Sequence, residues 1–313
     1  MFEIERYTAD QKAIWNQFVL NSKNGTFLFD RNYMDYHSDR FEDYSLMIYR
    51  KGKLYSLLAA NKMGSVLYSH QGLTYGGLIM SDKVTVADSV EMFRVINACL
   101  KESGFEKVIY KPIPFIYHQY PAQEDLYALF RTSNAKIIGR NISSTIFQNG
   151  NKLRFSELRR RCIRKSLNAG VSVIQSNDYE AFWNILNMNL QNRYGVLPVH
   201  SLDEIRLLHS HFPNNIKLYM AYKGDVPLGG SLLYITKQVV HTQYISASVE
   251  GKELGALDLL FDYLINKEYT SYLYFDFGQS TENMGSVLNE SLIFQKEGFG
   301  GRGMCYDIYE YDL

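Results

Sequence analysis

Cysteine is scarce in this 313-residue sequence. Its three cysteines, Cys99, Cys162 and Cys305, are odd in number, far apart and without a CxxC pair. A disulfide framework needs paired cysteines, and a zinc site needs cysteine or histidine clusters at ligand spacing. We therefore expect neither a disulfide scaffold nor a bound metal.

Long apolar runs are also missing. No uncharged apolar stretch reaches the ~18 residues that a membrane span requires. The first six residues, Met1–Arg6, do not form a basic segment followed by an apolar run, the pattern of a secretory signal. The sequence therefore predicts no transmembrane segment and a cytoplasmic location.

The chain has no excess of charge of either sign. Lysine plus arginine number 33, aspartate plus glutamate also number 33, and 46% of the residues are hydrophobic. A neutral chain gives no global electrostatic reason to bind DNA, so we expect no DNA partner, although local basic patches remain open. The length fits two globular domains of roughly 150 residues each.

The two halves of the sequence show the same order of predicted elements. Each half has leading helices, a three-strand meander, a helix, a strand, a helix and a closing strand. The meander strands fall at 44–50, 54–61 and 66–70, and again at 216–222, 228–236 and 239–248. We predict an α/β fold of the α+β type with two duplicated domains, 1–150 and 151–313. Each would be a mixed, mostly antiparallel sheet flanked by helices.

The junction after the last meander strand of the second half could hold an anion. It reads Ser248–Ala256 and leads into a helix predicted over 255–267. Glycines at a helix start let phosphate approach free backbone N–H groups. The candidate residues for a cofactor are Gly251, Lys252, Gly255 and Ala256. The alternative is an ordinary loop, because Glu250 and Glu253 would repel a phosphate.

Three residues are candidates for acid–base chemistry. Asp276 lies at the end of a strand predicted over 272–277, where ligand sites of α/β folds gather. His70 and His241 lie in or at the ends of strands, and a histidine can accept a proton near neutral pH. The structural alternatives are a helix cap or salt bridge for Asp276 and ordinary hydrogen bonding for the histidines.

A basic helix predicted over 155–169 opens the second half. At ~100° per residue, Arg160, Arg161 and Arg164 share one face, opposite Phe155, Leu158 and Cys162. Guanidinium groups bind phosphate in a bidentate manner, so this face is a candidate substrate-binding surface; the alternative is a solvated helix face. The remaining substrate-binding candidates are Tyr75, Arg193, Tyr194, Ser280 and Lys296.

Four segments together resemble the FemAB-like branch of the GNAT acyltransferase superfamily: Tyr68–Gly77, Arg161–Ser166, Phe275–Gly278 and Gln295–Gly300. That branch contains tandem GNAT proteins. Some are Fem peptidyltransferases, which move an amino acid from aminoacyl-tRNA to a peptidoglycan precursor. Others are acetyltransferases linked to polysaccharide or cell-wall synthesis. The long helical insertion of some Fem enzymes is absent from this sequence.

The resemblance implies a transferase and a place for its donor. GNAT enzymes hold the coenzyme A pyrophosphate with a pattern of Gln or Arg, two residues, Gly, one residue, then Gly or Ala. Gly255 matches the last glycine, whereas Glu250 and Glu253 replace the leading residue and the middle glycine. The first-half junction, Gly77–Lys83, has no glycine at its helix start.

Three functions follow as hypotheses. The first is transfer of an acyl group from acyl-CoA, such as acetyl-CoA, to an amine or hydroxyl of an amino sugar, polysaccharide or cell-wall precursor. The acceptor would be a small molecule or glycan precursor, held in a groove between the two halves. The second is Fem-type transfer from aminoacyl-tRNA to a peptidoglycan precursor. The third is a catalytically silent protein that binds a glycan or nucleotide sugar.

Overall fold

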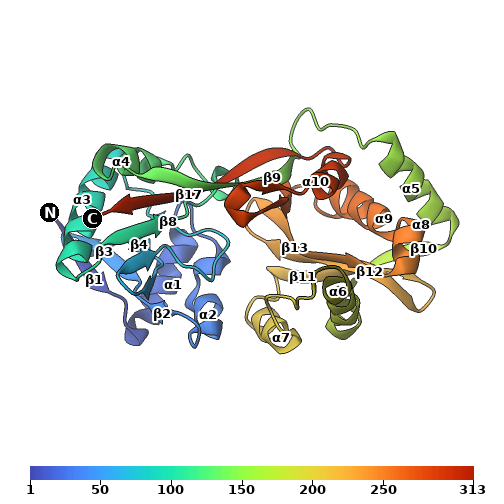
Figure 1. The fold of residues 1–313 in the computed structure, drawn as a ribbon, viewed down its shortest axis with the longest axis horizontal. Helices are drawn as coiled ribbons and strands as arrows, with labels where there is room; N and C mark the ends of the chain where they lie inside the picture. Colours follow the sequence, from blue (N-terminus) through green and yellow to red (C-terminus); the bar gives the residue numbers. More distant parts are fainter. The chain divides into compact units, whose positions relative to one another are not determined.

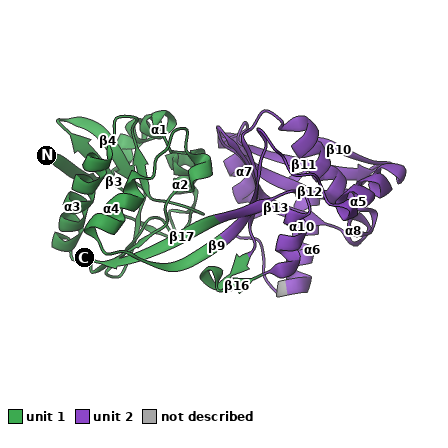
Figure 2. Ribbon diagram, turned by 90° about the horizontal axis from the view of Figure 1, so that it is seen from above, with its two compact units in different colours: residues 1–141, 281–288, 305–313 green, residues 142–280, 289–304 purple. Residues whose placement is uncertain are grey.

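The computed structural model describes residues 1–313 except for the side chain of Tyr194. The chain forms two compact units, shown in Figure 2. Unit 1 comprises residues 1–141, 281–288 and 305–313, and unit 2 comprises residues 142–280 and 289–304. Strands β9 (Lys136–Phe147) and β17 (Arg302–Asp312) each contribute residues to both units. The units are therefore not two continuous segments of sequence.

Unit 1 is built on antiparallel strands in the order β1-β3-β4-β7, with further pairing among β2, β5, β6, β8 and the end of β17. The bounds are β1 (Phe2–Arg6), β2 (Glu42–Asp43), β3 (Leu46–Arg50), β4 (Lys53–Leu58), β5 (Asn61–Met63), β6 (Val66–Tyr68), β7 (Leu78–Met80) and β8 (Lys107–Tyr110). The small strands β15 (Thr281–Glu282) and β16 (Val287–Leu288) pair with each other.

The simple three-strand meander predicted for the first half is wrong. Its second strand, predicted over 54–61, is divided between β4, which ends at Leu58, and β5, which begins at Asn61. β5 pairs with β6, which also pairs in parallel with β8, whereas β4 pairs with β7. Residues 69–77 separate β6 from β7, and positive φ angles at His70 (64°) and Gly77 (85°) turn the chain there. The glycine-rich stretch thus makes a loop that leads to β7, a strand that the sequence pattern did not predict.

The helices of unit 1 cover its sheets. They are α1 (Lys12–Asn21), α2 (Arg31–Met34), α3 (Val86–Glu102) and α4 (Glu124–Thr132), with 3₁₀ turns at Ala9–Gln11, Phe27–Phe29, Asp35–His37, Phe115–Tyr117 and Asn283–Gly285. Phe93, Ile96 and Leu100 recur on one face of α3 and are buried in the core of unit 1. This is the face that the apolar periodicity predicts.

Unit 2 contains a six-strand sheet. Its order is β10-β11-β12-β13-β14-β9, antiparallel except for the parallel pair β13–β14. The bounds are β10 (Val171–Ser176), β11 (Ile216–Lys223), β12 (Val226–Ile235), β13 (Val239–Ala247) and β14 (Tyr274–Gln279). The predicted strands of the second half are confirmed to within a few residues, because their apolar runs are long and end at clear turns.

Helices lie on both faces of this sheet. Figure 1 shows α5 (Glu157–Asn168), α9 (Ala256–Tyr263) and α10 (Glu290–Glu297) on one face, and α6 (Tyr179–Tyr194) and α7 (Leu202–His211) on the other. The helix predicted over 255–267 is confirmed, and the short helix that precedes it was not predicted. Gly255, with φ of 75°, separates α8 (Val249–Leu254) from α9, and residues Leu264–Glu268 continue as a π-helix.

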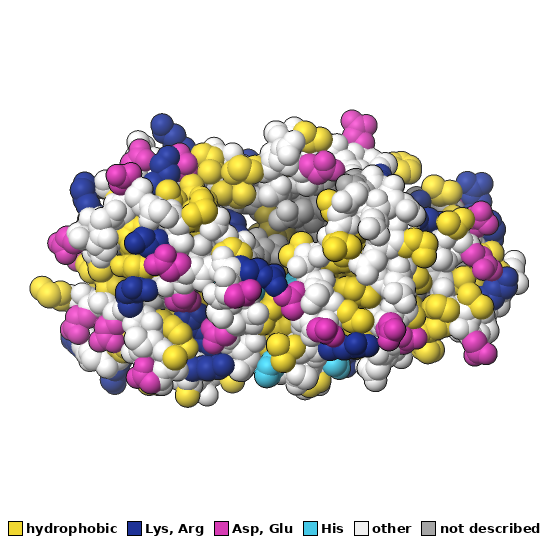
Figure 3. Space-filling view, turned by 60° about the horizontal axis from the view of Figure 1, so that its bottom comes forward, with side chains coloured by type: hydrophobic (Ala, Val, Ile, Leu, Met, Phe, Trp, Pro, Cys, Tyr) yellow, Lys and Arg dark blue, Asp and Glu magenta, His cyan; other side chains and the backbone are white. Residues whose placement is uncertain are grey.

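Charged side chains are spread over the surface in both signs. On the face drawn in Figure 3, lysine and arginine side chains alternate with aspartate and glutamate, without a broad field of one sign. This matches the net charge of zero. No helix in the described part of the chain is long and apolar enough to cross a membrane.

Candidate functional site

The candidate site lies where the neighbouring strands β13 and β14 of unit 2 stop pairing and diverge. Strands β13 and β14 pair in parallel over three residues, ending at His241 opposite Asp276. Beyond that point β13 continues against β12 as far as Ala247. Gly278 turns β14 away with a φ of 73°, and a Cβ atom there would lie 3.1 Å from His241 Cε1. His241 and Asp276 therefore lie at the apex of a divergence within the sheet.

Asp276 is a buried carboxylate with three hydrogen-bond donors. His241 Nδ1 lies 2.7 Å from Oδ2, while Thr145 Oγ1 and Ser143 Oγ donate to Oδ1 at 2.7 and 2.5 Å. Burial by itself raises the pKa of Asp276, but these donors, led by His241, hold the pKa below its usual value. Asp276 is therefore ionised at neutral pH, and it makes Nδ1 of His241 the protonated nitrogen.

His241 is the part of this pair that a ligand can reach. Its side chain is 14% exposed, whereas that of Asp276 is 0% exposed. Within the described residues, Nε2 of His241 has no hydrogen-bond partner. With Nδ1 donating to a carboxylate, Nε2 carries the lone pair of a neutral imidazole. The arrangement can therefore accept a proton at Nε2.

Lys296 brings a buried cation to the same place. From α10, its Nζ donates to the carbonyl oxygens of Gly278 and Gln279 at 2.9 and 2.7 Å. Burial lowers the pKa of Lys296 to about 8, although the charge of Asp276 acts in the opposite direction. The adjacent Ser280 is buried, and its Oγ has no partner among the described residues. The structure thus gathers four predicted residues: His241, Asp276, Ser280 and Lys296.

The glycines of the β13–α8 junction are packed against protein. Ser248 Oγ caps α8 by accepting from Gly251 N at 3.0 Å, and a Cβ on Gly251 would collide with the Leu228 carbonyl oxygen. A Cβ on Gly255 would lie 2.9 Å from the Cys162 carbonyl oxygen of α5. Both glycines therefore allow a close approach of backbone to backbone.

Two charged residues of this junction, Glu250 and Lys252, are paired within unit 2. Lys252 Nζ donates to Asn189 Oδ1 at 2.7 Å, and Glu250 pairs with Lys223 at 3.1 Å. Ala256 is fully buried at the start of α9. The role of Gly251, Lys252, Gly255 and Ala256 in holding a cofactor stays a prediction, and the geometry gives each of them a packing or pairing role.

We expect Gly255→Ala to destabilise unit 2 more than Gly224→Ala. Both glycines have positive φ, 75° and 58°, so both substitutions carry the backbone strain of a left-handed residue. Only the Cβ at 255 has a close neighbour, whereas nothing lies within 4 Å of a Cβ at 224. The excess loss of unfolding free energy should be about 1–3 kcal/mol. Equal losses in urea unfolding would show that Gly255 has no packing role.

The basic face predicted for α5 is exposed to solvent. Arg160 and Arg164 both pair with Glu157, at 2.8 and 3.0 Å, and Arg161 is also exposed. Leu158, predicted opposite the three arginines, is 37% exposed. The buried face carries Ile163 and Ser166 instead.

Sequence reasoning missed Arg159, which lies on the buried side of α5. It forms an ion pair of 2.8 Å with Asp258 of α9 and lies over the ring of Phe299. The sequence did contain a signal for this difference. At ~100° per residue, Arg159 lies about half a turn away from Arg161 and Arg164, on the other side of the helix.

Two further candidates, His70 and Tyr75, belong to unit 1. His70 is 3% exposed, stacks on His37 at 5.4 Å, and burial lowers its pKa to about 3. Tyr75 donates from its hydroxyl to Thr26 Oγ1 at 3.1 Å. A catalytic role for His70 and a binding role for Tyr75 stay predictions, and the contacts within unit 1 are those of core residues.

The last two substrate-binding candidates, Arg193 and Tyr194, lie at the C-terminal end of α6. Arg193 lies in the last turn of that helix and is exposed, and Tyr194 is the residue whose side chain lies outside the described part of the structure. Among the described residues, no group of three or more His, Cys, Asp or Glu side chains could hold a metal ion.

Comparison with known families finds a similarity over most of unit 2. Residues 156–284 match the family model of the acetyltransferase (GNAT) domain. This segment is similar to a GNAT domain. Its two catalytic candidates on neighbouring strands, His241 and Asp276, both lie within the matched GNAT range. No curated protein sequence matches the chain.

Solved structures extend the likeness to the whole chain. FemX has a TM-score of 0.69 at 12% identity, covering 99% of this chain and 97% of its own. The C-terminal domain of a protein described as a lysylphosphatidylglycerol synthetase from Agrobacterium fabrum has a TM-score of 0.60 at 12% identity, covering 96% and 91%. A tandem GNAT protein from the clavulanic acid biosynthesis pathway has a TM-score of 0.50 at 9% identity, covering 100% and 98%.

These similarities confirm the predicted resemblance to FemAB-like tandem GNAT proteins and the predicted fold class. They also confirm the expectation of a transferase with a GNAT-type acyltransferase fold.

Proposed function

We propose that the chain is an aminoacyltransferase that moves an amino acid from aminoacyl-tRNA to an amine of a peptidoglycan precursor. The observation that carries the transfer chemistry is the His241–Asp276 pair at the apex where β13 and β14 diverge. The similarity to FemX over nearly the full length of both chains supports the aminoacyl donor. The similarity to a lysylphosphatidylglycerol synthetase domain supports it as well.

His241 would act as the general base of the transfer. The acceptor amine attacks the carbonyl carbon of the aminoacyl ester, a C–N bond forms, and the C–O bond to the ribose breaks. Nε2 of His241 takes the proton that the amine loses and returns a proton to the ribose oxygen as it leaves. Asp276 stabilises the imidazolium formed between these two steps, because its carboxylate faces Nδ1 at 2.7 Å.

Lys296 would stabilise the negative charge that develops on the carbonyl oxygen. An ammonium has three N–H donors, and two of those on Lys296 bond the carbonyl oxygens of Gly278 and Gln279. The third is available for a substrate oxygen. A fixed, largely buried donor is effective because it needs no reorganisation as charge develops.

The β13–α8 junction favours an aminoacyl ester over coenzyme A. The two glycines that would admit a pyrophosphate approach protein backbone instead, at Leu228 and Cys162. Glu250 and Glu253 add two carboxylates to the same turn. A pyrophosphate docked there would therefore meet like charge and little free backbone.

Transfer from an acyl-CoA to an amino sugar or polysaccharide acceptor is the second candidate. It is favoured by the match of residues 156–284 to an acetyltransferase family model. A silent glycan-binding protein has less support, because such a protein would not need a buried carboxylate that orients a reachable histidine.

Donor binding separates the two candidates. We expect aminoacyl-tRNA to be retained with the full chain in filter binding, with an affinity that falls as salt rises because phosphate contacts release counterions. We expect no heat in calorimetry with acetyl-CoA. A clear acetyl-CoA isotherm together with no tRNA retention would overturn the proposal in favour of the acyl-CoA donor.

The rate of transfer should fall as pH rises through the pKa of Lys296, about 8. Above that pH the side chain is neutral and no longer stabilises the developing oxyanion. Lys296→Arg keeps the charge at high pH, so the fall should move beyond the measured range. A kcat–pH profile of both proteins tests this, and identical profiles would remove Lys296 from the charge-stabilising role.

The lowered pKa of Lys296 also makes the unfolding free energy depend on pH. The folded-state pKa of Lys296, about 8, is below its usual value of 10.5, so the unfolded chain binds the proton more tightly. The contribution of Lys296 to the unfolding free energy is therefore least favourable below pH 8. It improves as pH rises from about 8 toward 10.5.

A further inference from the structure

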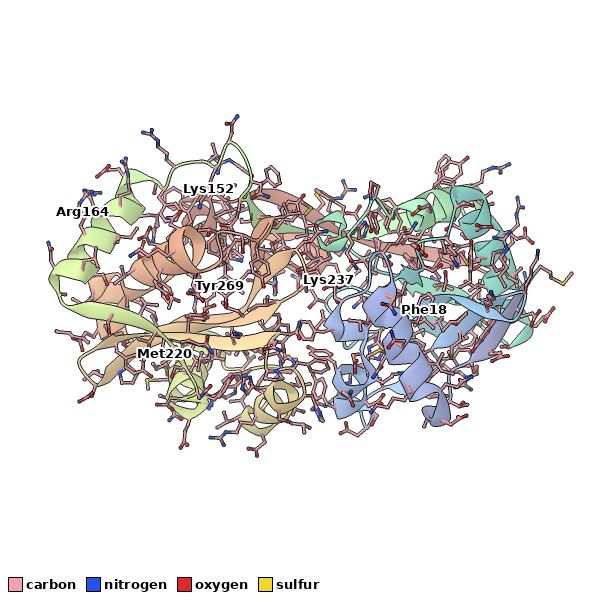
Figure 4. The ribbon with its side chains drawn as sticks, turned by 180° about the vertical axis from the view of Figure 1, so that it is seen from behind. Phe18, Lys152, Arg164, Met220, Lys237 and Tyr269 are labelled. Atoms are coloured by element: carbon pink, nitrogen blue, oxygen red, sulfur yellow. The ribbon has the colours of Figure 1, made fainter. Side chains whose placement is uncertain are left out.

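A basic cavity in unit 2 lies outside the proposed catalytic site. It has a volume of about 510 Å³ and is lined by α5, the segment before it, and residues Asp262 and Asn266. Four cationic side chains contribute to its lining: Lys152, Arg154, Arg160 and Arg164. Figure 4 shows Arg164 on α5 and Lys152 on the segment that leads into this helix.

Charge is concentrated here in an otherwise neutral chain. Residues 150–168 contain seven basic residues and one acidic residue, Glu157. Two of the cations stay accessible, because the side chains of Arg160 and Arg164 are 51% and 61% exposed even though both pair with Glu157. One carboxylate cannot neutralise the segment, so it presents a local positive field.

Asp262 and Asn266 are the other polar residues of the lining, and Lys152 Nζ donates to Asn266 Oδ1 at 2.7 Å. The rest of the lining is apolar. Phe155 and Ile163 are largely buried beside the cations, and Leu153 is 45% exposed at the surface. Leu167 is 56% exposed and follows Ile163 by four residues and Arg164 by three, so it continues the cavity side of α5. Cations interleaved with exposed aliphatic side chains are typical of segments that bind the interface of an anionic bilayer.

We propose that this basic cavity, with Leu153 and Leu167, binds the surface of an anionic membrane, with a lipid phosphate among the four cations and aliphatic side chains in the headgroup region. A nucleic-acid backbone suits the surface less well. Residues that bind single strands combine cations with exposed aromatic platforms, and the aromatic side chain that lines this cavity, Phe155, is 8% exposed.

Membrane binding is independent of the proposed transfer reaction. It would place a transferase beside lipid-linked substrates. Loss of catalysis through His241 should leave it unchanged, and loss of membrane binding should leave transfer to a soluble acceptor unchanged.

The test is flotation of the full chain with two kinds of vesicle, phosphatidylcholine alone and phosphatidylcholine with phosphatidylglycerol. We expect binding to the anionic vesicles only. The double variant Arg160→Ser/Arg164→Ser should lower partitioning about 30-fold, since each basic residue at an anionic surface contributes about five-fold. The matched control is Arg206→Ser on α7, an arginine of unit 2 that is 49% exposed and distant in sequence.

Two further variants test the apolar part. Leu167→Ser should weaken binding to anionic vesicles, whereas Leu207→Ser on α7, a leucine with 47% exposure, should not. The proposal is overturned if the wild-type chain stays unbound to anionic vesicles, or if Arg206→Ser weakens binding as much as the double variant. Retention of uncharged tRNA that Arg160→Ser/Arg164→Ser abolishes, without vesicle binding, would assign the cavity to nucleic acid instead.

Discussion

Replacing His241 by alanine should lower kcat for amino acid transfer by about 10²–10⁴-fold, the range expected when a general base is removed. KM should change little, because the imidazole acts on the proton of the attacking amine rather than as the main contact of either substrate. The fold should persist, since His241 is partly exposed and its side chain bonds Asp276 through Nδ1. Steady-state transfer of a radiolabelled amino acid measures the effect.

Two companion variants make this result specific. Asp276→Asn keeps the shape of the side chain but lets an amide donate to His241, which shifts the imidazole proton to Nε2 and removes the base. We expect a loss of similar size. His209→Ala on α7 removes a histidine of the same unit whose Nδ1 lies 2.9 Å from the Ile216 carbonyl oxygen, and should leave kcat unchanged. A His241→Ala enzyme within threefold of the wild-type kcat would contradict the proposed role.

Replacing Asp258 by alanine should give the largest loss of stability, about 3–5 kcal/mol of unfolding free energy. Asp258 is buried beside Arg159, with 9% and 13% of their side chains exposed, and the two groups lie 2.8 Å apart. Alanine would leave the guanidinium of Arg159 buried without its counter-charge, against the ring of Phe299. Urea unfolding followed by the fluorescence of Trp183, in a Trp15→Phe background, reports on unit 2.

The matched control is Asp203→Ala, which removes an exposed carboxylate 3.7 Å from Arg206 and should cost under about 0.5 kcal/mol. The double variant Arg159→Met/Asp258→Leu should recover most of the stability, since apolar residues can replace a buried ion pair at little cost. A loss for Asp258→Ala as small as that of Asp203→Ala would show that the pair contributes nothing beyond its surface counterparts.

Much of the fold followed from local patterns. Apolar runs bounded by turns located β11, β12 and β13, and a helical apolar period located α3. The divergence of β13 and β14 could not be predicted this way. It depends on where parallel pairing stops, which the φ angle of Gly278 and the bonds from Lys296 to its carbonyl determine in three dimensions.

The sequence indicated individual residues of the candidate site, but not the contacts between them. Asp276, His241 and Lys296 were singled out separately from strand ends and titratable side chains. Their contact required knowing that positions 241 and 276 face each other across a parallel pair. Ser143 and Thr145, more than 130 positions before Asp276, carried no sequence signal of their role. Conversely, Gly255 matches the last glycine of the coenzyme A motif, but in the structure this glycine lies close to the backbone of Cys162 in α5.

The donor and the role of His241 can be measured together by comparing the two donors in one assay. The full chain is given either [¹⁴C]aminoacyl-tRNA or [¹⁴C]acetyl-CoA together with peptidoglycan precursors, and label in the precursor fraction is counted. We predict label from aminoacyl-tRNA, its loss in the His241→Ala variant, and none from acetyl-CoA. Label that came from acetyl-CoA alone, or that persisted in His241→Ala, would contradict the assignment of an aminoacyl donor to the His241–Asp276 site.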